Sequence, residues 1–259
     1  MDHVSPQFQH DADGCRGDGQ RNVSAGRGKR FFFIALCTLA TLAFVGLGMW
    51  QVQRRAWKLE LIAATAARVH APPVALPPPS RWATVNAHDD AYRRLRVSGT
   101  FRHDREALVQ ALTERGAGYW VLTPLRTDTG TVLINRGFVP EERRAPQSRA
   151  AGQVGGRVTV TGLLRISEPG GALLRANQPA ADRWYSRDVG AIARARRLGP
   201  VAPFFIDADA TPNPGGWPVG GLTVIAFPNS HLVYALTWFA LAALSAFGAW
   251  QLIAPKRAR

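Results

Sequence analysis

The histidine that opens the last apolar run is the residue of this chain best placed to do chemistry. Residues 232–250 hold no charged side chain, which is long enough for a helix to cross a bilayer. His231 precedes this run directly. On a helix it shares one face with Tyr234, Ala235 and Trp238. An imidazole in this place is either an anchor at the membrane interface or a ligand, and the residues alone leave both open.

A second uncharged run, residues 31–49, predicts another membrane helix. At ~1.5 Å rise per residue the run reaches ~28 Å, close to the ~30 Å hydrocarbon core. A cleaved signal peptide is the alternative, because Arg27, Lys29 and Arg30 precede the run. Signal peptides carry a shorter apolar region, about 7–15 residues, followed by an Ala-x-Ala-like site that is missing here. We therefore expect two retained transmembrane helices, 31–49 and 231–254.

The basic residues that flank the second run predict the orientation. Lys256, Arg257 and Arg259 follow it, whereas no Lys or Arg lies between Arg197 and His231. Loops rich in Lys and Arg stay in the cytoplasm. We expect a multi-pass protein of the bacterial inner (plasma) membrane, with both termini cytoplasmic and the central domain periplasmic.

Composition excludes several classes of function. The formal net charge is +14, but it comes almost entirely from arginines spread along the chain, so we expect no nucleic-acid partner. The cysteines are Cys15 and Cys37, both outside the central segment. That segment therefore has neither a disulfide nor a thiolate metal site.

Outside the two runs the chain divides into four further parts. Residues 1–30, rich in Gly, Asp and Arg, predict a disordered cytoplasmic tail, and 255–259 form a second short tail. Residues 50–70 contain neither Pro nor Gly and predict a helical extension at the membrane interface. Five prolines between 72 and 79 then break the helix. Residues 71–230 form the external domain.

The external domain is expected to be mainly β with one or two helices, so the fold class is an α+β membrane protein. The predicted strands are 92–101, 107–112, 119–125, 131–139, 158–166, 204–206 and 222–227. A short helix is expected at 188–198. Residues 128–130 are a hairpin signal, and Gly99 is expected to mark a β-bulge.

Little in this domain is typical of an enzyme. There is no Gly-x-Ser-x-Gly, no Walker loop and no His-Glu-x-x-His. His70, His88 and His103 are expected to be surface residues, and Asp104 and Glu106 beside His103 to form a solvated turn. The segment 135–137, Asn-Arg-Gly, is expected to be structural, with Gly137 in a special backbone conformation and Arg136 paired internally.

Five segments together resemble the surfeit locus protein 1 family, and the resemblance covers about residues 31–254. In chain order they are Gly48–Lys58, Tyr92–Phe101, Val132–Pro140, Trp184–Asp188 and His231–Phe239. Phe138 departs from the family pattern, which has Trp after Asn-Arg-Gly. The family-motif residues expected to be structural are Trp50, Gln51, Trp57, Gly99, Phe101, Asn135, Arg136, Gly137, Trp184 and Tyr185.

The resemblance implies a non-enzymatic assembly factor for cytochrome c oxidase in the membrane. Such a protein helps to deliver haem a into subunit I, with subunit I and haem A synthase as partners. His231 is then the candidate axial ligand of the haem iron, and no other metal is implied. By extension from the residues, Tyr234 and Trp238 could line the macrocycle, and Arg54 or Arg55 could meet a propionate.

Two other functions are open alternatives. A structural assembly partner would hold an oxidase intermediate through its β domain without binding haem. A copper chaperone is disfavoured, because the external domain lacks cysteine and the methionines are Met1 and Met49.

Overall fold

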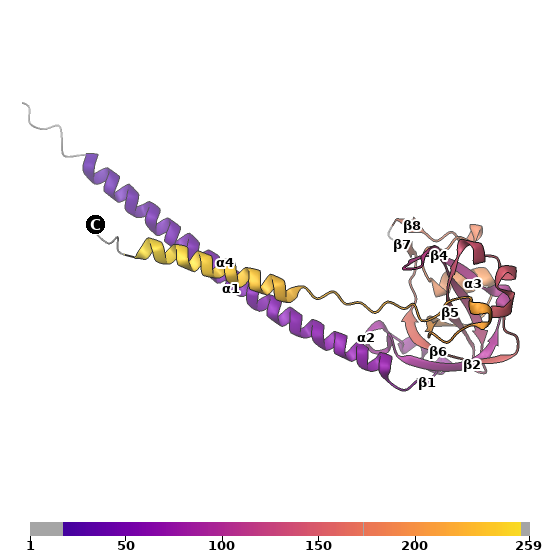
Figure 1. The fold of residues 1–259 in the computed structure, drawn as a ribbon. Coiled ribbons are helices and arrows are strands. Elements are labelled where there is room, and N and C mark those ends of the chain that lie inside the picture. The colour runs from indigo at the N-terminus through magenta and orange to yellow at the C-terminus, as the bar shows by residue number, and fades with distance from the viewer. Residues whose placement is uncertain (1–17, 173, 255–259) are drawn as a thin grey trace, which may run out of the picture. The chain divides into compact units, whose positions relative to one another are not determined.

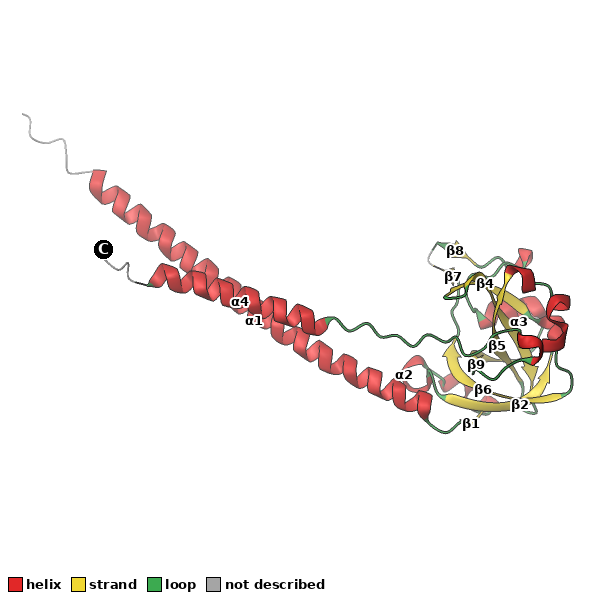
Figure 2. Ribbon diagram, viewed as in Figure 1, coloured by secondary structure: helices red, strands yellow, loops and turns green. Residues whose placement is uncertain are grey.

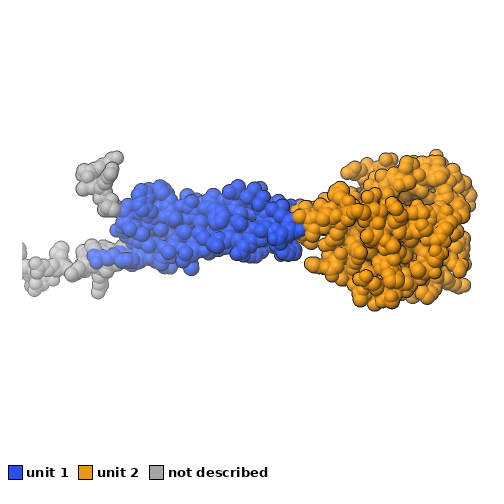
Figure 3. Space-filling view, turned by 90° about the horizontal axis from the view of Figure 1, so that it is seen from below, with its two compact units in different colours: residues 1–60, 228–259 blue, residues 61–227 orange. Residues whose placement is uncertain are grey.

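The chain forms two compact units in a computed structural model that describes residues 18–172 and 174–254. One unit comprises Met1–Glu60 and Pro228–Arg259, and the other comprises Leu61–Phe227 (Figure 3). We refer to them as the helical unit and the β unit. The first contains one whole helix and most of a longer one, and the second contains every strand described (Figure 1).

A single helix, α1, runs from Asp18 to His70. It ends just before Pro72 and Pro73, whose rings cannot continue a helix. The predicted helical extension over 50–70 is therefore confirmed as a helix. Residues 18–30 are also helical, where a disordered tail was expected, because lengthening an existing helix costs far less than nucleating one. The rest of that predicted tail, 1–17, lies outside the described residues.

The second helix, α4, spans His231–Ile253. By length and composition, α4 and the stretch of α1 from Arg27 to His70 are both candidate membrane spans. Their most apolar windows are only 17% and 6% buried, respectively, unlike the core helix of a soluble protein. Large apolar side chains are exposed along both helices, as a lipid-facing surface requires.

The β unit is built on a seven-stranded sheet that closes on itself (Figure 2). The strand order is β1-β2-β6-β9-β5-β4-β3, and β2 also pairs with β4 through Thr100 and Arg126. The five strands β2, β6, β9, β5 and β4 therefore form a barrel. The strands are β1 (Val74–Ala75), β2 (Arg94–Phe101), β3 (Ala107–Thr113), β4 (Gly116–Arg126), β5 (Thr131–Pro140), β6 (Arg157–Ile166) and β9 (Val201–Ala208).

Smaller elements complete the β unit. The two-residue strands β7 (Gly171–Ala172) and β8 (Arg175–Ala176) form a separate hairpin. The helices are α2 (Ala87–Asp90) and α3 (Val189–Arg196). The Asp188 carboxylate caps α3 by accepting a hydrogen bond from the Ala191 amide at 2.9 Å. This confirms the helix expected at 188–198.

Two apolar clusters lie on opposite faces of the closed sheet. The interior cluster is made of Trp82, Leu95, Val97, Phe101, Leu125, Val132, Ile134, Leu164, Ala202, Phe204 and Ile206. The outer cluster, under α3, is made of Ala107, Val109, Leu122, Leu133, Trp184, Val189, Ala191, Ile192 and Phe205. Successive residues of a strand point to opposite faces, so β5 and β9 contribute to both clusters. Their sequences are accordingly apolar at nearly every position.

The structure corrects two local expectations. Gly99 is not a bulge, because β2 and β6 stay in register from Arg94 to Thr100. Instead, a Cβ on Gly99 would collide with the carbonyl oxygen of Arg126, so the glycine lets β2 approach β4 and close the barrel. The segment 222–227 is not a strand but irregular chain. Thr223 in this segment bonds to Asp207 of β9, but β9 is already paired with β5 and β6, so the segment cannot join the sheet there despite its β propensity.

Substituting Gly99 by Ala tests the closure of the barrel. The added methyl group would separate β2 from β4, and overpacking of this kind costs about 1–3 kcal/mol. Gly155→Ala is the matched control, since no atom lies within 4 Å of the Cβ it would add. Denaturant unfolding of the full-length protein in detergent, followed by circular dichroism, should show a loss of stability only for Gly99→Ala. Equal stability of both variants would contradict this role for Gly99.

Candidate functional site

The helical unit is held together by a seam of small residues. Ala235, Ala242 and Ala249 are 2%, 5% and 8% exposed, and they recur every seven residues along α4. On α1, Gly48 is buried, and a Cβ there would collide with the ring of Phe239. Small residues at a helix contact let two backbones approach closely. The two helices therefore make the close backbone contact that is typical of helix pairs in membranes.

The two helices run antiparallel. At one end Arg30 donates a hydrogen bond to the carbonyl oxygen of Leu252 at 2.6 Å. At the other end the side chains of Gln51 and His231 are in contact. The start of α4 therefore lies level with Gln51.

The contact between His231 and Gln51 orients the imidazole. Nδ1 of His231 lies 2.7 Å from Oε1 of Gln51, which is 8% exposed. An amide oxygen can only accept, so Nδ1 carries the proton and donates it. In this tautomer Nε2 holds the free lone pair. Metal-ligating histidines are held in the same way, by a hydrogen bond from the nitrogen that does not bind the metal.

The predicted aromatic face divides in two. Trp238 stacks on Phe44 of α1, with ring centroids 5.6 Å apart and planes at 25°. Tyr234 is 55% exposed. Trp238 thus belongs to the contact between the helices, whereas Tyr234 is open to a ligand or to lipid.

The predicted cationic residues lie one turn beyond Gln51 on α1. The guanidinium of Arg54 lies 4.0 Å from the ring centroid of Trp57, and Arg55 is half-buried. At ~1.5 Å per residue both lie within ~6 Å of Gln51 along the helix axis. Trp50 and Trp57 are 54% and 48% exposed, as interfacial tryptophans would be. Positive charge therefore gathers at the His231 end of the helix pair.

This arrangement suits a ligand that needs one imidazole. Among residues 18–172 and 174–254, no group of three or more His, Cys, Asp and Glu side chains is placed to enclose a metal ion. A haem requires less, because its own ring supplies four nitrogens and the protein supplies an axial ligand. An oriented Nε2, an exposed tyrosine and nearby guanidiniums fit such a group.

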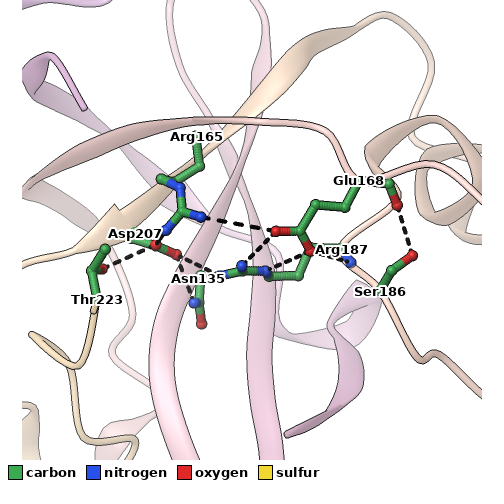
Figure 4. A network of polar contacts seen from close by, with 7 residues as sticks. All are labelled: Asn135, Arg165, Glu168, Ser186, Arg187, Asp207 and Thr223. Atoms are coloured by element: carbon green, nitrogen blue, oxygen red, sulfur yellow. Dashed lines mark hydrogen bonds and ion pairs between the residues drawn. The ribbon is translucent and has the colours of Figure 1, made fainter. Parts of the chain in front are cut away.

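The β unit has its own polar centre at Asp207, near the end of β9 (Figure 4). Its side chain is 3% exposed and receives four hydrogen bonds. The donors are Asn135 at 2.7 Å, Arg165 at 2.8 Å, Thr223 at 3.0 Å and Arg187 at 3.4 Å. Four donors of this kind satisfy both oxygens of the buried carboxylate. The sequence analysis did not identify Asp207 and Arg165 as members of a buried network. The signal for Asp207 was a charged residue directly after the apolar strand residues Phe204-Phe-Ile206.

Glu168 extends this network through Arg187. The guanidinium of Arg187 donates two hydrogen bonds to Glu168, at 2.6 and 3.1 Å. Burial acts to raise the pKa of Glu168, but the hydrogen bonds and charge of Arg187 outweigh it and lower the pKa below its usual 4.5. Since the cations and carboxylates pair with one another, the network is suited to holding strands together.

The family-motif residues of the β unit have structural roles. Asn135 donates to Asp207 and accepts a hydrogen bond from the amide of Gly137, whose φ is 127°. The special backbone predicted for Gly137 is therefore confirmed. Trp184 is 1% exposed and donates to the carboxylate of Asp182 at 2.7 Å. The amide of Tyr185 donates to the side chain of Asn177 at 2.8 Å.

The histidines of the β unit only partly match expectation. His70 and His88 are exposed, as predicted. His103 is half-buried against Phe101, with ring centroids 5.4 Å apart, so the surface prediction was wrong for this residue. Burial lowers its pKa. Glu106 is also not solvated, because the buried guanidinium of Arg149 pairs with it.

Comparison with known proteins gives one consistent result. The model of the SURF1 family matches residues 38–243. Surfeit locus protein 1 of Rattus norvegicus is 37% identical over 219 residues, covering 78% of this chain and 69% of the rat protein. The Homo sapiens protein of that name is also 37% identical, with coverage of 78% and 71%. A SURF1-like protein of Monosiga brevicollis is 42% identical, with coverage of 82% and 83%.

Glu168→Gln tests the charge network. A carboxylate whose pKa is lowered on folding adds stability above its unfolded pKa, about 4.5, and loses it as pH falls through the folded pKa. The variant should therefore be less stable than wild type at pH 7, and the difference should shrink below pH ~4.5. Denaturant midpoints across this range measure it, with exposed Glu114→Gln as the control. A difference that does not change with pH would contradict the assignment.

Proposed function

The chain belongs to the SURF1 family, and from this premise we propose that it is an assembly factor for cytochrome c oxidase that transiently holds haem a for delivery to subunit I. The observation that carries this proposal is the orientation of His231 by Gln51, at 2.7 Å. Haem a is the cargo of the protein in this proposal, and the chemistry of the ring is not altered.

The imidazole of His231 is the proposed axial ligand. The hydrogen bond to Gln51 holds the tautomer whose Nε2 lone pair is available to iron. Gln51 is buried between the helices, so the ring is oriented before a ligand arrives. Preorganisation of this kind lowers the entropic cost of binding.

Neighbouring residues supply the remaining contacts that a haem needs. Tyr234 offers an exposed aromatic ring to the apolar macrocycle, and Trp238 supports it from the contact with Phe44. Arg54 and Arg55 lie within reach of the same helix end and could pair with the propionates. These groups bind and orient the cargo, and a proton need not move.

A carrier must also release what it binds. Among the described residues of the helical unit, His231 is the one histidine. Ligation by a single imidazole from this chain leaves the other axial position of the iron to a partner. Subunit I is the proposed acceptor and haem A synthase the proposed donor. In this proposal the protein is a chaperone and not an enzyme.

The proposed location is a bacterial inner membrane, with the β unit in the periplasm. The basic residues after α4, and their absence before it, support this orientation. His231 would then lie at the periplasmic interface.

Haem binding is tested by coexpressing the full chain with the enzymes that make haem a and purifying it in detergent. The wild type should carry a haem spectrum, and His231→Ala should lose it. Gln51→Leu should weaken binding about 10–100-fold, as expected for removal of a group that orients a ligand. His88→Ala, an exposed histidine of the β unit, is the control and should bind as wild type.

Two outcomes would contradict the proposal: a wild type without haem, or a spectrum that His231→Ala leaves unchanged. If oxidase assembly in cells also survives His231→Ala, the protein acts as a structural assembly partner that binds no haem.

Orientation is tested with single cysteines in a chain whose Cys15 and Cys37 are replaced by Ser. A cysteine at exposed Ser80 should react with a membrane-impermeant maleimide in intact spheroplasts. A cysteine at Ala258, next to the C-terminal basic residues, should react only after permeabilisation. The reverse pattern would place the β unit in the cytoplasm.

A further inference from the structure

Arg30 joins the two helices at the end of the helical unit that lies away from His231. Its side chain donates hydrogen bonds to the carbonyl oxygens of Leu252 and Ile253, at 2.6 and 3.3 Å (Figure 1). Carbonyl oxygens in the last turn of a helix have no amide partner within that helix. Arg30 therefore satisfies two of these groups and fixes the end of α4 beside α1.

Further basic residues gather at this end, which we call the basic end. Arg27 and Lys29 lie just before Arg30 on α1, and both are exposed. Arg27 and Arg30 are three residues apart and share one helix face, so Arg27 lies on the side of α1 that meets α4. Lys256 and Arg257 follow shortly after the end of α4 in the sequence. Both helices thus bring positive charge to one place.

The helices offer these cations no acidic partner. No Asp or Glu occurs in residues 19–59 or after residue 209. Asp18, at the start of α1, is nine residues from Arg27, or ~14 Å along the helix axis. Charges in water are screened over ~8 Å at physiological salt. The charge at the basic end is therefore available to an anion from outside the chain.

Large apolar side chains lie directly next to the basic end on both helices. Phe31 and Phe32 of α1 are 67% and 63% exposed, and Trp250 and Ile253 of α4 are both 59% exposed. A free phosphate ion would gain nothing from these side chains. A phospholipid carries both an anionic phosphate and acyl chains, so it matches the cations and the apolar surface together.

We propose that the basic end binds an anionic phospholipid. The headgroup phosphate accepts a hydrogen bond from Arg27, and Lys29 adds to the electrostatic attraction. The acyl chains lie along the exposed apolar side chains of α1 and α4. Arg30 has a positioning role, because it holds the two helix ends together. The proposal requires both helices to lie in a membrane, but it does not depend on haem binding.

Phosphatidylglycerol is the probe, and phosphatidylcholine with the same acyl chains is the zwitterionic control. Native mass spectrometry of the full-length protein in detergent should show saturable binding of phosphatidylglycerol. Phosphatidylcholine should bind at least tenfold more weakly. Glycerol phosphate, which has the phosphate but no acyl chains, should not compete. Equal binding of the two lipids would overturn the proposal, and competition by glycerol phosphate would show that the site takes a free phosphate instead.

A double variant, Arg27→Gln with Lys29→Gln, locates the site. Each basic residue near an anionic lipid surface contributes about fivefold in affinity, so the variant should bind phosphatidylglycerol at least tenfold more weakly. Arg115→Gln with Arg183→Gln is the matched control, because it removes the same charge from exposed positions of the β unit. The control should bind as wild type. Wild-type affinity in the first variant, or an equal loss in both, would contradict the assignment.

A charge-conserving variant separates lipid binding from folding. Arg27→Lys with Lys29→Arg retains both charges and should bind phosphatidylglycerol within about threefold of wild type. Since removal of basic residues can change the orientation of a membrane protein, the orientation of the Gln variant is verified with the cysteine at Ala258. If the Gln variant does not fold, the comparison of the two lipids on the wild type still decides the proposal. Haem binding at His231 should be unchanged in all variants, so a failure of either proposal is distinguishable from a failure of the other.

Discussion

The arrangement of the β unit depends on one buried carboxylate, that of Asp207. It joins β9 to β5 through Asn135, to β6 through Arg165 and to the irregular chain after the barrel through Thr223. A buried charge that loses its partner costs about 3–5 kcal/mol, so these segments are constrained to meet at this point. The network fixes which strands become neighbours, whereas the apolar clusters on the two faces of the sheet supply most of the driving force.

Different interactions hold the helical unit together. Its side chains are largely exposed and apolar, as in helices that face lipid, and in lipid the burial of apolar surface would contribute little to a contact between helices. Close approach at Gly48 and the alanines of α4, and the hydrogen bond between Gln51 and His231, take its place. The same contact that joins the helices therefore also orients the imidazole. A substitution at Gln51 or His231 would therefore alter both the packing of the helices and the orientation of the imidazole.

The pattern of residues along the sequence was enough to predict the helices and most strands. It was not enough to predict which strands pair or which side chains bond to one another. Both long helices and most strands follow from runs of apolar or β-branched residues, and the turn at 128–130 follows from its Asp and Gly. Periodicity does not report contacts between residues far apart in sequence. Such contacts include the parallel pairing of β5 with β9, the closure of β2 on β4 and the hydrogen bonds to Asp207.

For the same reason Gln51 was identified only as a motif residue. Its partner lies 180 positions away. His103 was misjudged because burial by Phe101 comes from the barrel, whereas its sequence neighbours are charged.

The spacing of Ala235, Ala242 and Ala249 has a consequence for the geometry of the whole span. A straight α-helix has 3.6 residues per turn, so a contact repeated every seven residues drifts by about 20° each time. The three alanines nevertheless all stay buried against α1. A stripe with this spacing faces its partner throughout when two helices cross at the shallow, left-handed angle of coiled coils, so the spacing favours that crossing for α1 and α4. The stripe then gives the two helices one long contact in place of a single crossing point.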